Sequence, residues 1–496
     1  MAMLATVTSA VLSGVDAIAI EVQVQVAPGV PSFQIVGMPD IAVAESKERV
    51  RAAFKSTGLT LPVKRVTVNL APAHVRKVGS GLDLPIALGI MTASGYLPQD
   101  FLRSFIVTGE LSLSGEVRAT RGSVSISRLA KKKGLSLLTG ALGEVKGILL
   151  APLATVDSLA HLMSLLQTGI ASQEHHTFTS VCPVQIPYDF SDVIDQDTAV
   201  RALTIAALGG HNLLMVGEPG TGKTMLAKRM PTIMRHLTSE ELLEVAQIQS
   251  AVEPGWIPSH QRPFRAPHHS TSAAGLIGGG CPIRPGEVSL AHNGVLFLDE
   301  MPEFKPTTLQ MLRQPLEEGS VTIVRAKETV RMPARFQLVA TANPCPCGYF
   351  GSQSHECTCS KQRIDQYRNR MGGPLLDRID MTVVVSRPSS KDLIERKGRS
   401  STSEIRSQIQ RALKFRSSCF PHASRAGTLC EYLDRRHFAP SAQDMLKTAA
   451  ESLRLSGRSL RKVSTVARTI ADLECCETVE IAHVAESLNY RQMSNG

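Results

Sequence analysis

Hydrophobic and polar residues follow two different periods in the first third of the chain. They alternate in Glu21–Val26 and Arg65–Leu70, and a period of two predicts half-buried β-strands. In Ile41–Ser56 the apolar positions recur at helical spacing and Gly58 follows as a stop, and Leu84–Tyr96 is a second, more apolar helix candidate. This mixture predicts a compact α/β domain at residues 1–167.

From about residue 190 the pattern changes to short, wholly apolar runs separated by helical segments. The runs are Leu213–Val216, Val295–Leu298, Gln337–Ala340 and Met381–Val385. Apolar runs without alternation are typical of parallel strands that helices cover on both faces. We therefore predict a second α/β domain at residues 190–388. Residues 168–189 lose periodicity and gain prolines, which predicts a linker, and residues 389–496 are basic and helical in period.

Composition narrows the class of protein. A chain of 496 residues with 43% hydrophobic and 20% charged residues can form several globular domains. No apolar stretch approaches the ~20 residues that a membrane span needs, and the first cation is Lys47, so the basic start of a signal peptide is missing. We expect a cytoplasmic protein without membrane contacts. The net charge is +10, and most of the excess lies from Lys361 onward, which favours a polyanionic partner.

A phosphate-binding loop follows the first apolar run of the second domain. The sequence GEPGTGKT matches G-x-x-x-x-G-K-[ST] between a predicted strand and a predicted helix. The backbone N–H groups of such a loop surround phosphates, its lysine reaches the outer phosphates and its last hydroxyl holds Mg²⁺. The predicted nucleotide-binding residues are Gly217, Glu218, Pro219, Gly220, Thr221, Gly222, Lys223 and Thr224, and the cofactors are ATP and Mg²⁺.

Acidic and amide side chains end the next two apolar runs. Asp299 and Glu300 follow Val295–Leu298, and Asn343 follows the third run. We expect Asp299 to hold Mg²⁺, Glu300 to deprotonate the attacking water and Asn343 to position that water. Together with the phosphate-binding loop, these residues predict ATP hydrolysis.

Besides these motifs, longer strings of residues indicate a resemblance to a known family. They include RAPHHS at Arg265–Ser270, PGEVSLAHNG at Pro285–Gly294, ANPCPCG at Ala342–Gly348, GPLLDRID at Gly373–Asp380 and ARTIADL at Ala467–Leu473. On these strings the chain resembles the magnesium-chelatase-like family of AAA+ ATPases, ComM/YifB type. The resemblance implies an α/β multidomain fold, with a Lon-protease-like (S5-type) N-terminal domain, an AAA+ P-loop core and a C-terminal α-helical lid.

The resemblance also assigns roles to individual residues. It makes Asn343 sensor 1 and Arg378 the arginine finger that meets a neighbouring subunit's ATP, which implies a homo-oligomeric ring, most often a hexamer. Arg458 is the expected sensor 2, with Arg461 and Arg468 as alternatives. Ser320–Met332 resembles the pre-sensor hairpin of the ring pore, where Arg325 and Lys327 would meet a polyanion backbone, unless Lys327 only solubilises an exposed turn. The insertion Ser270–Ala291 resembles the helix-2 insert.

Four of the ten cysteines lie within fifteen residues, directly after Asn343. Cys345 and Cys347 form one C-x-C pair, and Cys357 and Cys359 form a second. Four thiolates at this spacing can enclose one tetrahedral Zn²⁺. The alternatives are reduced, unligated cysteines, or a disulfide, which a reducing cytosol disfavours.

The resemblance raises the question of whether the N-terminal domain is an active protease. In the Lon-like fold, peptide cleavage needs a serine nucleophile and a lysine base. Ser80 lies near the expected nucleophile loop without the pattern that surrounds it in proteases, and Val124 stands where the lysine belongs. We expect a degenerate protease fold.

Three functions compete on these grounds. The first is a ring motor on single-stranded or branched DNA, a helicase that remodels recombination intermediates as ComM-type relatives do. The second is a chelatase-type or protein-remodelling motor, and the third is an ATP-dependent protease, which lacks its dyad. The basic C-terminal region favours the first.

Overall fold

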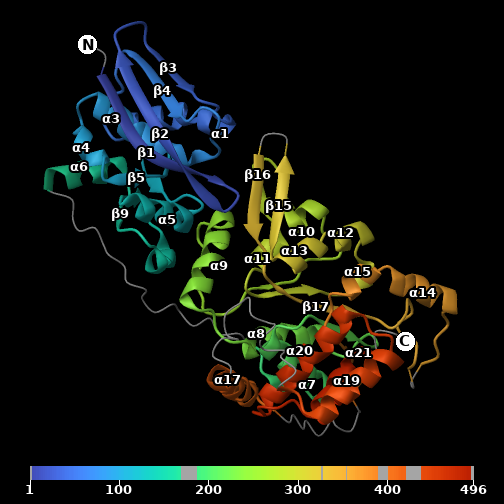
Figure 1. Ribbon diagram of the computed structural model, residues 1–496. Coiled ribbons are helices and arrows are strands. Elements are labelled where there is room, and N and C mark those ends of the chain that lie inside the picture. Colours follow the sequence, from blue (N-terminus) through green and yellow to red (C-terminus); the bar gives the residue numbers. More distant parts are fainter. Residues whose placement is uncertain are drawn as a thin grey trace.

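The computed structural model describes residues 3–168, 187–325, 328–352, 355–388, 400–419 and 437–492. Most of the predicted linker, residues 169–186, lies outside the described residues. The N-terminal α/β domain lies at one end of the molecule, the central core follows, and the C-terminal helices pack beneath the core (Figure 1). None of the described helices is long and apolar enough to span a membrane.

The N-terminal domain is built on a four-stranded sheet with the order β1-β2-β4-β3. Strands β1 and β2 form a long antiparallel hairpin that is paired from Met3↔Val26 to Ser13↔Asp16. The predicted helix at 41–56 is two helices that are separated at Glu45. The buried Asp83 binds Ser46 and Arg49 in the first turn of the second helix. The elements are β1 (Met3–Ser13), β2 (Asp16–Ala27), β3 (Ser32–Val36), β4 (Arg65–Ala71), α1 (Ile41–Ala44) and α2 (Ser46–Ser56).

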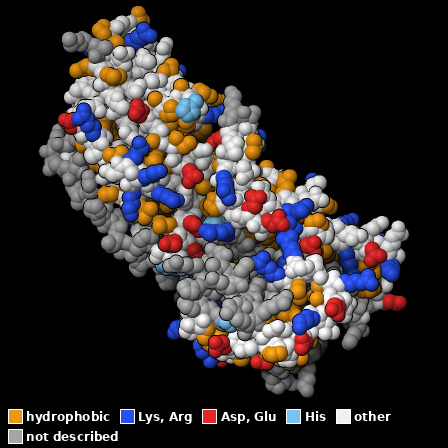
Figure 2. Space-filling model, in the orientation of Figure 1, with side chains coloured by type: hydrophobic (Ala, Val, Ile, Leu, Met, Phe, Trp, Pro, Cys, Tyr) orange, Lys and Arg blue, Asp and Glu red, His pale blue; other side chains and the backbone are white. Residues whose placement is uncertain are grey.

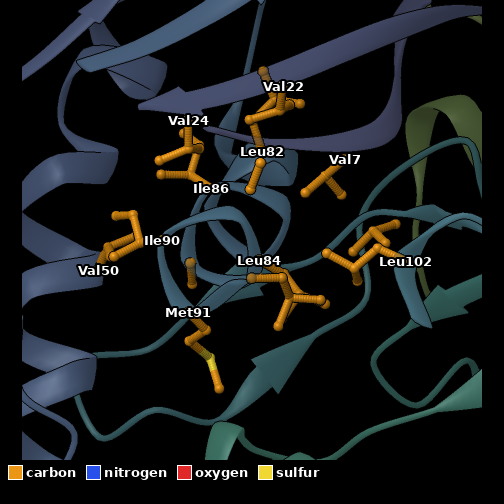
Figure 3. Close-up of a cluster of buried hydrophobic side chains, with 14 of the residues drawn as sticks. Val7, Val22, Val24, Val50, Leu82, Leu84, Ile86, Ile90, Met91 and Leu102 are labelled. Atoms are coloured by element: carbon orange, nitrogen blue, oxygen red, sulfur yellow. The ribbon is translucent and has the colours of Figure 1, made fainter. Parts of the chain in front are cut away.

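Helix α3 (Asp83–Ala93) fills the core of this domain. Nearly all of its residues are buried. Figure 3 shows Ile86 beside Val24 of the sheet and Ile90 beside Val50 of α2, while Leu84 lies toward Leu102. A smaller parallel sheet with the order β5-β8-β9 and the short pair β6–β7 complete the domain. The remaining elements are α4 (Gln99–Leu102), β5 (Phe105–Val107), β6 (Glu110–Leu111), β7 (Val117–Arg118), α5 (Ser123–Lys133), β8 (Ser136–Thr139), β9 (Leu153–Thr155) and α6 (Leu159–Thr168).

The central core contains a five-stranded parallel sheet with the order β11-β14-β17-β10-β18. The four runs predicted as buried strands form four of its members, and their apolar side chains are buried on both faces. The strands are β10 (Leu213–Val216), β11 (Phe264–Arg265), β14 (Val295–Leu298), β17 (Gln337–Ala342) and β18 (Met381–Val384). Because these strands all run in one direction, their carboxyl ends meet at one edge of the sheet and their amino ends at the other.

Helices and two hairpins surround this sheet. Strands β12 (Gly278–Gly279) and β13 (Arg284–Pro285) pair within the predicted insert, and β15 (Ser320–Arg325) pairs with β16 (Glu328–Pro333) as the predicted antiparallel hairpin. The helices are α7 (Asp197–Gly209), α8 (Lys223–Ile233), α9 (Ser239–Val252), α10 (Ala273–Ile277), α11 (Glu287–Leu290), α12 (Pro306–Gln310), α13 (Arg313–Glu318), α14 (Lys361–Asn369) and α15 (Gly373–Leu376).

The C-terminal region is helical, as its period indicates. It comprises α17 (Thr402–Cys419), α19 (Pro440–Ser452), α20 (Gly457–Leu473) and α21 (Ile481–Gln492). Helix α20 joins the core, because Val466 and Ile470 share a buried cluster with residues of β10 and α7. Its opposite side packs with α19 and α21 in a second cluster. Ile405, Ile409 and Ala412 of α17 and Tyr490 of α21 belong to the same core cluster as Val466 and Ile470. The C-terminal helices are therefore attached to the core through α17, α20 and α21.

Candidate nucleotide site

The phosphate-binding loop connects the carboxyl end of β10 to the first turn of α8. Gly217 starts the loop against the neighbouring strand: a Cβ atom there would lie 2.3 Å from the carbonyl oxygen of Val385. Only glycine therefore fits this position. The N-terminal turn of α8 follows at Lys223, so the loop directs backbone N–H groups and the positive end of a helix toward one point.

Lys223 is the central cation of the loop. Its Nζ donates to the carbonyl oxygens of Gly217 at 2.7 Å and Glu218 at 2.8 Å, and to Oδ1 of Asn343 at 3.2 Å. Burial lowers the pKa of Lys223, and the charges of Asp299 and Glu300 oppose this effect. The structure thus brings the predicted lysine and the predicted sensor 1 into direct contact.

The two residues expected to hold Mg²⁺ are also in contact. Thr224 donates from Oγ1 to Oδ2 of Asp299 at 2.9 Å. A hydroxyl and a carboxylate oxygen on adjacent elements are hard ligands of the kind that Mg²⁺ prefers. The Thr224 hydroxyl and the Asp299 carboxylate therefore fit Mg²⁺ beside a bound nucleoside triphosphate.

Thr341 holds the acidic pair in place, and the motifs did not identify it. It is fully buried in β17, donates from Oγ1 to Oδ1 of Asp299 at 2.6 Å and accepts the backbone N–H of Glu300 at 2.8 Å. Glu300 has a φ of +50°, a strained conformation for a residue with a side chain. The hydroxyl within the otherwise apolar run QLVATA was the only sign of this role in the sequence.

Tyr367 is a second residue near the site that the motifs did not reveal. It lies in α14 and is 4% exposed. Burial raises the pKa of Tyr367 to about 12, and the charges of Glu303 and Glu300 add to this, while a hydrogen bond with the backbone of Asn343 opposes it. Helix α14 is therefore packed directly against the sensor 1 segment.

The four predicted cysteines converge beside Asn343. The Sγ atoms of Cys345 and Cys347 are 3.3 Å apart, and that of Cys357 lies 3.7 and 3.6 Å from them. All four Sγ atoms, including that of Cys359, lie within 4.8 Å of one another. A tetrahedral zinc site with Zn–S bonds of about 2.3 Å needs S–S separations of about 3.8 Å. The thiols therefore fit Zn²⁺.

One of these thiols is in an environment that favours the thiolate. The backbone N–H of Tyr349 donates to Cys347 and, with a further contribution from Cys345, lowers the pKa of Cys347 to about 6. Metal ligation by cysteine requires the deprotonated form.

Arg378 lies at the opposite edge of the sheet from the phosphate-binding loop. It precedes β18, and β18 runs parallel to β10 with Leu213 opposite Met381, so Arg378 is at the amino ends of the strands. Its guanidinium binds the carboxylate of Glu317. The side chain is 5% exposed, and its Nε is a buried donor for which no partner is found among the residues described.

The three sensor 2 candidates occupy different environments. Arg458 is half exposed and reaches the same Glu317 at 3.2 Å. Arg468 is fully buried and forms an ion pair with Asp472 at 3.0 Å. Arg461 lines a cavity of about 540 Å³ between α19 and α20.

The C-terminal helices hold the segment that follows Arg378. Lys462 of α20 and Arg491 of α21 both donate to the carbonyl oxygen of Ile379, at 3.0 and 3.1 Å. Lys462 also pairs with Asp380 at 2.9 Å. At the same edge, a cavity of about 880 Å³ includes Glu317 in its lining. None of the residues that line this cavity belongs to the phosphate-binding loop, and the cavity therefore belongs to the edge that carries Arg378.

The predicted residues of the pore hairpin and of the protease site lie away from the phosphate-binding loop. Arg325 ends β15, is exposed and pairs in register with Glu328, while Lys327 lies outside the described residues. In the N-terminal domain, Ser80 donates its hydroxyl to Glu110, and Val124 is buried in α5. The side chain that meets Ser80 is thus a carboxylate.

Sequence profiles of known families match three consecutive parts of the chain. "Subunit ChlI of Mg-chelatase" matches residues 22–141, "Magnesium chelatase, subunit ChlI" matches 189–393, and "Magnesium chelatase, subunit ChlI C-terminal" matches 399–491. About a third of the chain is also similar to a protein outside these profiles. The DNA replication licensing factor mcm6 of Dictyostelium discoideum is 25% identical over 36% of this chain and 17% of its own length.

Two relatives are similar over nearly their whole length. The competence protein ComM of Haemophilus influenzae is 39% identical over 99% of this chain and 98% of its own length. The uncharacterized protein YifB of Escherichia coli is 37% identical over 96% of this chain and 95% of its own length. The chain therefore belongs to the magnesium chelatase ChlI family of AAA ATPases, and within it to the ComM/YifB type.

Proposed function

We propose that this protein is a ring-shaped motor that hydrolyses ATP to move along DNA and remodel branched recombination intermediates. ATP hydrolysis follows from membership of the family. The observation that supports the mechanism is the convergence of Lys223, Thr224, Asp299 and Asn343 at one edge of the sheet. The DNA substrate is supported by the similarity to a competence protein and, in part of the chain, to a DNA replication factor.

Each residue at the site is proposed to have its own role in ATP hydrolysis. Lys223 neutralises the outer phosphates, while Thr224 and Asp299 hold Mg²⁺, which polarises the phosphoryl group when it is bound. Glu300 accepts the proton of the attacking water, and Asn343 orients that water through its side-chain amide. Thr341 keeps Glu300 and Asp299 at a fixed separation, because one hydroxyl binds both.

Arg378 and Arg458 act on the nucleotide of a neighbouring subunit in this proposal. Both contact Glu317 at the amino edge of the sheet, whereas the chain's own phosphate-binding loop is at the carboxyl edge. A cation at the amino edge reaches a nucleotide only when another subunit presents one there. A ring closes this arrangement by repeating one head-to-tail interface.

DNA is proposed to pass the β15–β16 hairpin, where Arg325 and Lys327 meet the phosphate backbone. Lys and Arg side chains are spread over the N-terminal domain and the core on the face in Figure 2, with acidic side chains between them. Contacts to phosphates read no base sequence, so we expect binding that weakens with added salt and has little sequence preference.

The N-terminal domain is proposed to be a Lon-like fold without protease activity. A serine nucleophile needs a base that removes its proton. Ser80 meets the carboxylate of Glu110, and Val124 stands where the lysine is expected. We further propose that Cys345, Cys347, Cys357 and Cys359 hold a structural zinc ion, because their Sγ separations suit tetrahedral ligation.

The first prediction tests the motor function through ATP hydrolysis by the full chain. We expect single-stranded, duplex or four-way-junction DNA to raise the rate several-fold, and the rise to shrink as salt is added. Lys223→Ala is the control and should lose nucleotide binding. A wild-type rate that none of the three DNAs changes would refute the DNA motor and favour a chelatase-type or protein-remodelling role.

The second prediction concerns Thr341. Thr341→Val removes both hydrogen bonds at nearly constant volume, and bonds to charged groups are worth about 1.5–3 kcal/mol. The kcat for ATP should therefore fall about 10- to 100-fold, with nucleotide affinity nearly unchanged. Thr341→Ser keeps the hydroxyl and should retain most of the rate. Equal losses in the two variants would show that the hydroxyl is not what matters.

The third prediction tests action between subunits. Arg378→Ala and Lys223→Ala should each reduce ATP hydrolysis about 1000-fold, as is typical for an arginine finger and a phosphate-binding lysine. In an equal mixture, intact loops meet intact arginines at about a quarter of the interfaces of a head-to-tail ring. Activity should therefore reappear on mixing. No recovery in co-assembled rings would place Arg378 in its own subunit's site.

The fourth prediction is the metal content of purified protein. We expect about one zinc per chain by elemental analysis, and its loss in Cys345→Ser and Cys357→Ser. Cys419→Ser alters an exposed thiol of α17 and should keep the metal. Less than a tenth of an equivalent of zinc in the wild type would overturn the assignment.

A further inference from the structure

The tip of the β1–β2 hairpin leaves the N-terminal domain and reaches the core. In Figure 1 it lies beside α9 and the β15–β16 hairpin. The strands are paired as far as Ser13↔Asp16, with Gly14 and Val15 forming the turn. These four residues, Ser13–Asp16, are called the N-terminal tip below.

The N-terminal tip is in direct contact with strand β16. Ser13 donates its hydroxyl to the carboxylate of Glu328. Gly14 has a φ of +62°, and a Cβ atom there would lie 2.3 Å from Cγ1 of Val330. Val15 is 2% exposed and belongs to the same buried cluster as Val330 and Met332. The apolar surfaces of the two hairpins therefore form one continuous core.

The core also holds the N-terminal tip from the other side. Gln247 of α9 donates from Nε2 to the carbonyl oxygen of Val15 at 3.2 Å and to Oδ1 of Asp16 at 2.8 Å. Ser125 of α5 donates to the same carbonyl oxygen at 2.6 Å. A turn whose backbone and side chains are bound on two sides is fixed in place, in contrast to the usual mobility of a hairpin turn.

The contact lies next to the residues proposed to meet DNA. Glu328 is the register partner of Arg325, at the outer end of the hairpin. Any displacement of this end relative to the N-terminal domain must break the Ser13–Glu328 bond and open the packing of Gly14 on Val330.

We propose that the N-terminal tip is a clamp that positions the β15–β16 hairpin for DNA, with Gly14 as the positioning residue. The N-terminal domain then determines how strongly DNA stimulates ATP hydrolysis, although it contributes no group to the nucleotide site. This inference rests on the proposed DNA motor function for its consequence, while the clamp itself can be measured without DNA.

The test compares Gly14→Ala with the matched control Gly134→Ala. Gly134 has a φ of +68°, and an added Cβ would meet nothing within 4 Å. Both variants therefore carry comparable backbone strain, and only Gly14→Ala adds a clash with the hairpin. Hydrogen exchange of the β16 amides at 328–332 should become at least 10-fold faster in Gly14→Ala and stay unchanged in Gly134→Ala. Stimulation by single-stranded DNA should fall at least threefold in Gly14→Ala, with the basal ATPase rate retained.

Two further variants guard against a general loss of folding. Ser13→Ala removes only the bond to Glu328 and should speed exchange at 328–332 more modestly. Gly14→Ala combined with Val330→Ala makes room for the added methyl group and should restore both exchange and DNA stimulation toward wild type.

The outcomes separate the two proposals. Exchange in Gly14→Ala equal to that in Gly134→Ala would overturn the clamp, and faster exchange with undiminished DNA stimulation would overturn its role in DNA handling. Wild-type protein that DNA does not stimulate would refute the motor function instead, and the exchange data would then still decide whether the clamp exists.

Discussion

The common direction of the strands in the central sheet is the constraint on which the rest of the molecule depends. Parallel strands end together, so the residues that follow β10, β14 and β17 converge although they are far apart in sequence. The same rule sends the residues that precede strands to the far edge, where Arg378 lies. One sheet therefore separates the groups that are proposed to bind a nucleotide from Arg378, which is proposed to meet the nucleotide of a neighbouring subunit.

The nucleotide edge depends on buried polar contacts as much as on its motifs. Thr341 binds both members of the acidic pair, and Lys223 spans the loop and Asn343. Within a protein interior such bonds fix geometry, because each unmet partner would carry a desolvation cost. The first of the four thiols is two residues after Asn343. On the other side, Tyr367 of α14 forms a hydrogen bond with the backbone of Asn343. The segment that carries sensor 1 is thus supported on both sides.

Sequence patterns predicted the parts of this structure that depend on residues close together in the sequence. Apolar runs predicted the buried strands, and the glycine-rich loop and the acidic pair predicted the contacts around Lys223 and Asp299. The patterns did not predict that Ser46 and Arg49 bind Asp83, because Asp83 is far along the chain. Thr341, Tyr367 and Glu317 were missed for the same reason. Their partners are distant in sequence, and a hydroxyl in an apolar run or one glutamate in a helix carries no motif.

The helical C-terminal region has a consequence for how the two edges communicate. Lys462 and Arg491, from two different helices, grip the same carbonyl oxygen, that of Ile379, one residue beyond Arg378. The helices that grip this carbonyl also pack against α7 and β18 of the core. A displacement of these helices would therefore act on the segment that follows Arg378, through the carbonyl oxygen of Ile379 and the carboxylate of Asp380. In the proposed ring, such a displacement would move the arginine that is proposed to face the neighbouring subunit.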